Sequence, residues 1–137
     1  MKRSILLALL LACGSALAAQ WTFVARSEGG KHERYIDVSS IRVTGDIRRA
    51  WFKSVYAAHV AKDDSGPDAN KWWSSTVGLR ACNCSEGTSR SEALTVYYED
   101  GTNDSDPSSA FPTPWEPVVP DTVRSAEMQF ICAWKPK

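Results

Sequence analysis

The four cysteines of this 137-residue chain limit its fold more than any other feature. One of them, Cys13, lies in an apolar N-terminal segment, apart from the other three. The chain begins MKRSILLALLLACGSALAAQ, in which Lys2 and Arg3 precede an apolar run that is too short to span a membrane. Ala16-Leu17-Ala18 supplies the small-x-small pattern that a signal peptidase recognises. We therefore predict that residues 1–18 are an export signal and that residues 19–137 form the mature domain.

Cys13 leaves the processing of this signal open. Leu10-Leu11-Ala12-Cys13 resembles a lipobox, in which the cysteine is lipidated and becomes the first residue of an anchored protein. Leu11 is not the usual small residue at its position, and ordinary cleavage after Ala18 or Ala19 is the alternative. Membrane attachment is expected only if Cys13 is lipidated, and in neither case is Cys13 a partner in a core disulfide.

Three cysteines, Cys82, Cys84 and Cys132, remain for the mature domain. Export leads to an oxidising compartment, where cysteines tend to pair, so one disulfide and one free thiol are expected. A bond between Cys82 and Cys84 is sterically poor, because Cα atoms two residues apart on a strand are separated by roughly 6.5–7 Å. A bond from either of them to Cys132 remains.

Alternating bulky residues predict an antiparallel sheet of about five to six strands. The expected strands are residues 21–25, two strands within 34–43 separated by a short kink at the Ser-Ser pair, and residues 47–56, 72–84 and 93–98. Thr44-Gly45-Asp46 is a tight hairpin signal, and the segment from Asp100 to Pro117, rich in Ser, Asp and Pro, predicts a loop.

The last segment changes to a helical pattern. Apolar residues recur at helical spacing from Val123 to Trp134, and Asp121 or Thr122 is the expected N-cap. The whole pattern predicts an α+β domain, in which a disulfide to Cys132 would tie the C-terminal helix to the sheet.

The charge balance excludes one class of partner. Removing Lys2 and Arg3 leaves 14 of 16 basic residues against 16 acidic residues, so the mature net charge is about −2 and nucleic acid is not an expected partner. The two histidines, His32 and His59, lie in or beside loops without a partner at metal-site spacing. No nucleophile elbow or phosphate-binding glycine loop is present, so we expect no enzyme, metal or cofactor.

Two features are candidates for a binding surface. Trp72 and Trp73 are neighbours, so one ring should enter the core while the other faces the opposite side, where Trp72 could anchor a partner unless the terminal helix covers it. Basic residues also cluster around the first hairpin, at Arg42, Arg48, Arg49 and Lys53. Arg48 and Arg49 should point to opposite faces, and they either meet an acidic or sulfated ligand or are simply solvated.

The order of these features resembles the surface-adhesin protein E family of exported Gram-negative bacterial proteins. The matching features are Trp21, YIDVSSI, IRRAW, a cysteine before a turn containing Arg90, LTVYYEDG, PWEPVVPDT and a cysteine inside the last helix. The resemblance implies about six strands with a C-terminal helix held on one face by a disulfide, and the family's two cysteines fall on Cys84 and Cys132. Cys82 has no expected counterpart and is a candidate free thiol, either buried or available for an intermolecular bond.

The resemblance also implies a function. Characterised members are surface adhesins that bind host proteins such as vitronectin, laminin and plasminogen, and they can form homodimers. We therefore expect a non-enzymatic exported protein at the cell surface, in the outer membrane or in the periplasm. The alternative is a periplasmic or outer-membrane accessory protein that has a structural role and no host ligand.

Overall fold

The computed structural model describes residues 18–63, 68–105 and 111–135, so most of the expected signal, including Cys13, lies outside the described residues. The elements follow one another as β1 Trp21–Arg26, η1 Glu28–Gly30, β2 His32–Asp37, η2 Val38–Ser40, β3 Arg42–Thr44, β4 Ile47–Tyr56, β5 Trp73–Asn83, β6 Thr88–Tyr98, β7 Asn103–Ser105, β8 Glu116–Pro117 and α1 Val123–Ala133. This is the α+β architecture expected from the sequence.

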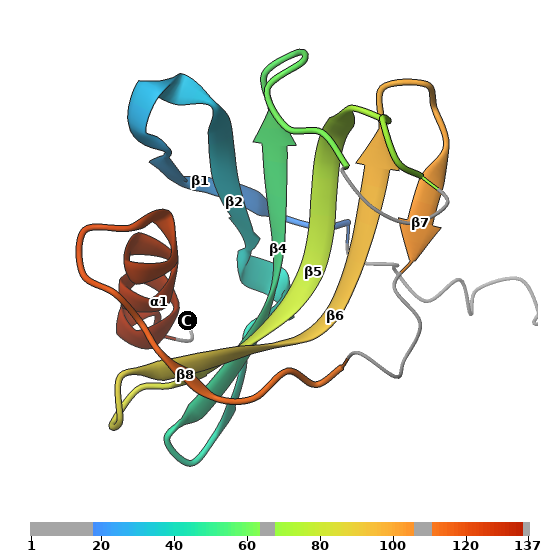
Figure 1. Ribbon diagram of the computed structural model, residues 1–137. Coiled ribbons are helices and arrows are strands. Elements are labelled where there is room, and N and C mark those ends of the chain that lie inside the picture. The colour runs from blue at the N-terminus through green and yellow to red at the C-terminus, as the bar shows by residue number, and fades with distance from the viewer. Residues whose placement is uncertain (1–17, 64–67, 106–110, 136–137) are drawn as a thin grey trace, which may run out of the picture.

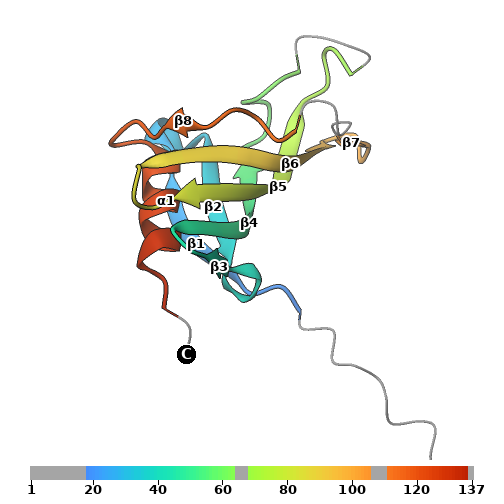
Figure 2. The ribbon, with the colours of Figure 1, turned by 90° about the horizontal axis from the view of Figure 1, so that it is seen from below.

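All strands belong to one antiparallel sheet with the order β1-β2-β4-β5-β6-β7, while β3 pairs with β4 and β8 pairs with β6. Figure 1 shows that the sheet is strongly bent and that the hairpin between β5 and β6 passes beneath α1. Figure 2, seen from below, shows α1 lying to one side of the strands. We call the sheet face that contacts α1 the inner face and the opposite one the outer face.

The core lies between α1 and the inner face. Along β4, Ala50, Phe52 and Ser54 are buried, while Trp51 and Val55 between them are exposed, as the two-residue period of a strand requires. The buried core cluster combines β2, β4, β5, α1 and the residue between η2 and β3, and it consists of Ile36, Ile41, Ala50, Phe52, Cys82 and Ile131.

A disulfide and an N-cap hold α1 in place, and both are expected from the sequence and the family resemblance. Cys84, directly after β5, forms a disulfide with Cys132 of α1, with the two Cα atoms 5.8 Å apart, which confirms the expected link between sheet and helix. Thr122 is the N-cap, since its hydroxyl accepts a hydrogen bond from the backbone N–H of Ser125 at 3.1 Å. Cys82 is a free thiol in the core.

Two expectations need correction. The segment from Asp100 to Pro117 is not only a loop, because the short strands β7 and β8 within it pair with β6. Neither Trp72 nor Trp73 enters the core cluster, and both rings are half-buried. An irregularity in the pairing of β5 with β6, between Trp73 and Ser75, interrupts the strand alternation there.

Within the described residues, no helix has the length and apolar character needed to cross a lipid bilayer.

Candidate binding surface on the outer face of the sheet

The outer face of the sheet exposes several large apolar side chains. Phe23, Trp51, Val55 and Tyr97 have exposed fractions of 51%, 40%, 39% and 40%. They come from β1, β4 and β6, and their strand positions place them on the face that α1 does not contact. Contiguous apolar patches on exported domains are typical of interaction sites, so this face is the candidate binding surface.

Strand register arranges this surface in rows that run across the strands, because directly opposed residues point to the same face. One row joins Phe23, Tyr35, Lys53, Val77 and Thr95 from β1 to β6. The neighbouring row joins Trp51, Leu79 and Ala93, and a third joins Val55, Ser75 and Tyr97. We call these three rows the apolar band.

Ring contacts make one side of the apolar band rigid. The rings of Phe23 and Tyr35 meet edge to face with centroids 5.8 Å apart. The ammonium group of Lys53 lies 4.9 Å from the ring centre of Trp21 and 6.0 Å from that of Tyr35. A partner would therefore meet side chains that are already ordered, which lowers the entropy lost on binding.

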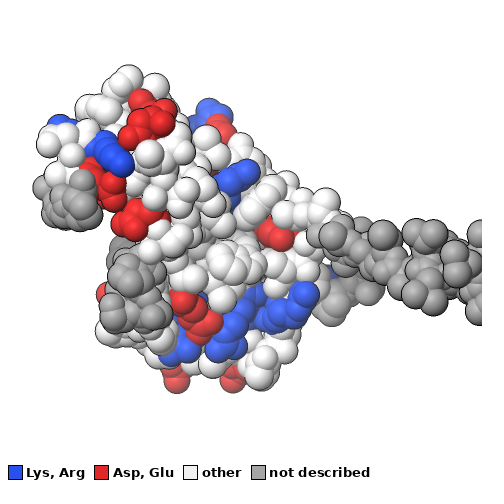
Figure 3. All heavy atoms as spheres, turned by 90° about the vertical axis from the view of Figure 1, so that its right-hand side faces the viewer, with Lys and Arg blue, Asp and Glu red and all other residues white. Residues whose placement is uncertain are grey.

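A row of arginines borders the apolar band. The register aligns Arg42 of β3 with Arg49 of β4, Arg49 with Ala81 of β5, and Ala81 with Arg90 of β6. We call Arg42, Arg49 and Arg90 the arginine row. Figure 3, which views the molecule from the side away from α1, shows Lys and Arg side chains gathered beside an uncharged area, with an acidic group among them.

Glu92 partly neutralises the arginine row. The pairing of β5 with β6 is irregular after Leu79, and Glu92 is the extra residue on β6. Its carboxylate accepts hydrogen bonds from Arg49 Nε at 2.8 Å and from Arg90 Nη2 at 2.7 Å. Although burial acts in the opposite direction, these hydrogen bonds lower the pKa of Glu92, so it stays charged at neutral pH.

Arg48 lies on the other side of the sheet from Arg49, as the alternation predicted. Its guanidinium donates hydrogen bonds to the carbonyl oxygens of Ile131 at 3.0 Å and Trp134 at 2.5 Å. These are carbonyls at the C-terminal end of α1, where a positive charge is favourable. The contacts occupy Arg48 inside the molecule, whereas its role in binding a partner stays a prediction.

Trp72 is covered by the loop before β5 rather than by the terminal helix. Its ring meets His59 edge to face at 5.1 Å, and the ammonium group of Lys62 lies 5.6 Å from the ring centre. His59 in turn pairs with Glu99 across 3.3 Å. The half-buried ring is thus integrated in the domain, and its role as an anchor remains a prediction.

Sequence reasoning found Arg49 but missed the apolar band and the role of Arg90. Arg49 and Arg90 are 41 positions apart in the chain, and only the pairing of both strands with β5 brings them together. The signal that could have indicated the band was the apolar character of both strand faces in residues 47–56.

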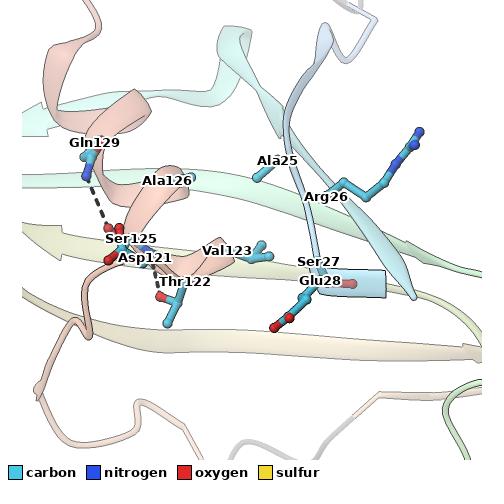
Figure 4. Close-up of a pocket in the computed structure, with 10 residues that line it drawn as sticks. All are labelled: Ala25, Arg26, Ser27, Glu28, Asp121, Thr122, Val123, Ser125, Ala126 and Gln129. Atoms are coloured by element: carbon cyan, nitrogen blue, oxygen red, sulfur yellow. Dashed lines mark hydrogen bonds between the residues drawn. The ribbon is translucent and has the colours of Figure 1, made fainter. Parts of the chain in front are cut away.

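A separate pocket of about 580 Å³ lies between the end of β1 and the start of α1. Figure 4 shows Glu28 and Asp121 at this pocket, while the side chain of Arg26 points away from α1. Glu28 and Asp121 are acidic and Thr122 already accepts the Ser125 N–H, so this pocket does not favour an anion. We assign no ligand to this pocket.

Metal-binding and nucleophilic groups are not assembled in the described part of the chain. No group of three or more His, Cys, Asp or Glu side chains there could hold a metal ion. Burial raises the pKa of the Cys82 thiol to about 12, so the thiol is protonated and unreactive at neutral pH.

Comparisons with known proteins agree with this architecture. The family model described as surface-adhesin protein E matches residues 21–133. A comparison with curated protein sequences finds no match. Among solved structures, the match to one of Haemophilus influenzae protein E covers 81% of this chain and 83% of that protein's chain, with 18% identity and a TM-score of 0.53. The match to a second structure, crystal form II of the same protein, covers 81% of this chain and 87% of that chain at the same identity and TM-score. At this identity the likeness shows a shared fold.

Proposed function

The chain belongs to the surface-adhesin protein E family, and we propose from this premise that it is an exported, non-enzymatic domain that binds another macromolecule. In this proposal the apolar band is the contact surface, and α1 and its disulfide keep the sheet rigid behind it. Export follows from the proposed signal in residues 1–18, and residues 19–137 are the proposed functional domain.

The exposure of Trp51 near the middle of the outer face is the observation that carries this proposal. Tryptophan and tyrosine are enriched among the residues that dominate binding energy, and such residues cluster near interface centres. Trp51 is neighboured across the strands by Leu79 and Ala93 and along β4 by Lys53 and Arg49. Exposed aromatic residues flanked by basic side chains are common in protein interfaces, where aromatic residues and Arg are enriched.

The candidate partners come from the family resemblance. Vitronectin, laminin and plasminogen are the host proteins to test first, and a second copy of this chain is a further candidate for the same face. A homodimer through the apolar band would compete with binding of a host protein, so the oligomeric state should be measured beside every binding assay.

The direct test is binding of the purified mature domain to immobilised vitronectin, laminin and plasminogen, compared with its Trp51→Ser variant. We expect Trp51→Ser to weaken binding about tenfold or more, because truncation of a central aromatic residue commonly costs over 1.4 kcal/mol. The matched control is Val119→Ser, which removes an apolar side chain that is 64% exposed but lies outside the apolar band. Equal binding by wild type and both variants would rule out the apolar band as the contact surface.

Location separates this proposal from the accessory-protein alternative. Antibodies against the mature domain should label intact cells of the native host if the protein is an adhesin. Labelling only after permeabilisation would remove the adhesin function and favour a periplasmic role. Mass spectrometry of the mature N-terminus on the same material would show whether Cys13 is lipidated or removed with the signal.

A further inference from the structure

The arginine row has N–H donors that have no hydrogen-bond partner among residues 18–63, 68–105 and 111–135. Each guanidinium carries five N–H donors in a planar fork. Arg49 donates to Glu92 through Nε and Nη2, and Arg90 donates to the same carboxylate through Nε and Nη2. Nη1 of Arg42 donates to the carbonyl oxygens of Ser39 and Ile41. The remaining N–H groups are left for an oxyanion from outside.

The row also keeps a positive charge. Glu92 is the carboxylate that pairs with Arg49 and Arg90, and no acidic side chain among the described residues forms an ion pair with Arg42. Three guanidinium groups and one carboxylate leave a local charge of about +2 on a domain whose sequence is net acidic after the signal. The positive charge is therefore concentrated at one border of the outer face.

The row is linear and lies beside an exposed indole ring. It runs from β3 to β6 across three strand spacings of about 4.8 Å, which gives a strip about 14 Å long. Trp51 follows Arg49 by two residues on β4 and so lies on the same face in the next row. At the far end, the guanidinium of Arg90 lies 4.6 Å from the ring centre of Trp115, which holds it in place.

These features fit a linear polyanion built of sugar rings. Arginine binds tetrahedral and planar oxyanions through two parallel N–H bonds, which suits sulfate and carboxylate groups. The apolar face of a sugar ring can pack on an exposed indole. Alternating anionic groups and rings along a chain would thus meet the arginine row and Trp51 together.

Two other anionic partners fit less well. Recognition of an anionic membrane normally takes a cluster of about four to eight Lys and Arg residues, more than this row offers. An acidic peptide could pair with the arginines, but it has no flat apolar ring to place against Trp51 at each step.

We propose that Arg42, Arg49 and Arg90 bind the sulfate and carboxylate groups of a linear sulfated polysaccharide while Trp51 packs against one of its rings. This inference rests on the proposed function, since it names a ligand class for one border of the same outer face. The extended strip and the adjoining ring select a chain rather than a single ion.

The test is calorimetric titration of the mature domain with heparin oligosaccharides of defined length at low salt. We expect Arg42→Gln and Arg90→Gln each to weaken binding about tenfold, because each removes one charge-assisted contact. The matched control is Arg26→Gln, which removes the same charge from the opposite edge of the sheet, where Arg26 pairs with Glu33. Equal losses in all three variants would show nonspecific charge attraction and overturn the inference.

A variant that is expected to gain affinity is also needed, because misfolding can explain a loss of binding but not a gain. Glu92→Gln removes the carboxylate that competes for Arg49 and Arg90, so heparin should bind several-fold more tightly. Glu33→Gln removes one negative charge at a position outside the arginine row, so it should leave the affinity for heparin nearly unchanged. An equal gain in both variants, or none in Glu92→Gln, would contradict the proposal.

Competing ligands separate the remaining outcomes. Hyaluronan, which carries carboxylates without sulfates, should bind more weakly than heparin. Stronger binding to an acidic peptide or to anionic lipid vesicles than to heparin would overturn the sulfated-polysaccharide assignment. Absence of heparin binding, together with loss of host-protein binding in Trp51→Ser, would sink this inference and leave the proposed function standing.

Discussion

Glu127 is a charged side chain enclosed between α1 and the inner face of the sheet, with an exposed fraction of 1%. Its carboxylate pairs with Arg34 of β2 and, at 3.1 Å, with Arg80 of β5. The two guanidinium groups lie over the ring of Phe52 at 4.3 and 4.9 Å from its centre. A charged cluster thus stands where a core of apolar residues would be expected.

Glu127→Gln should destabilise the domain by about 3–5 kcal/mol, because it leaves two enclosed arginines without their counter-charge. Urea unfolding followed by tryptophan fluorescence measures this loss. Glu116→Gln is the control, since Glu116 forms an exposed pair with Arg124 that should contribute less than about 1 kcal/mol. Equal unfolding midpoints for the two variants would contradict the assigned role of Glu127.

Gly78 gives Phe52 room on the inner face, since the two residues are opposed in the register of β4 and β5. A Cβ atom at position 78 would lie 2.6 Å from the carbonyl oxygen of Ala93 and 2.6 Å from Cζ of Phe52.

We expect Gly78→Ala to cost about 1–3 kcal/mol of stability, because the backbone oxygen of Ala93 cannot move aside as a flexible side chain could. The melting temperature measures the effect. An unchanged or raised melting temperature would mean that β5 and β6 do not pack this closely around Phe52.

At the scale of elements, α1 is held by specific links in addition to the apolar residues that it packs against the core. Thr122 caps its first turn, Arg48 binds its last carbonyls, and the Cys84–Cys132 disulfide joins it to the end of β5. These links secure both ends of a helix of only 11 residues, which would be marginal alone.

Cys132→Ser should loosen α1 and lower stability by about 4 kcal/mol in the chain-entropy model, since the disulfide closes a separation of 48 residues. Thermal melting under oxidising conditions is the measurement. Wild type in the presence of a reductant should melt close to the variant, which provides the control. Unchanged melting of Cys132→Ser would rule out the disulfide's role in holding α1.

At the scale of the whole molecule, the bent sheet and α1 form one enclosed core with Cys82 inside it. The same arrangement leaves the outer face free for a partner. Accessibility of the Cys82 thiol therefore reports whether sheet and helix separate.

When the mature domain is folded at neutral pH, a disulfide reagent should label no thiol. When the domain is unfolded in denaturant, the same reagent should label one thiol, that of Cys82. The reason is that burial raises the pKa of Cys82 to about 12, so the reactive thiolate is scarce until the core opens. Rapid labelling of the folded domain would show that sheet and helix separate readily. Cys82→Ala, which should remain unlabelled in both states, is the control.

Much of this protein's secondary structure can be predicted from local patterns in the sequence. The hairpin signal at Thr44-Gly45-Asp46 precedes the strand predicted over residues 47–56, which is β4 at its observed bounds. The helical spacing after Thr122 predicts α1, because a helix with one covered face repeats its apolar residues at the helical period. The family resemblance pointed to Cys84 and Cys132 as the disulfide. These features depend on neighbours along the chain or on short motifs.

Only the tertiary structure decided which face of the sheet is covered and what lies on the other. Arg42, Arg49 and Arg90 form a row because the register of β3, β4, β5 and β6 aligns residues far apart in sequence. Glu127 is buried because α1 docks over Arg34 and Arg80, which no helical period can reveal. Strand pairing and helix docking are contacts between distant segments, so the sequence determined the elements while their assembly determined the binding surface.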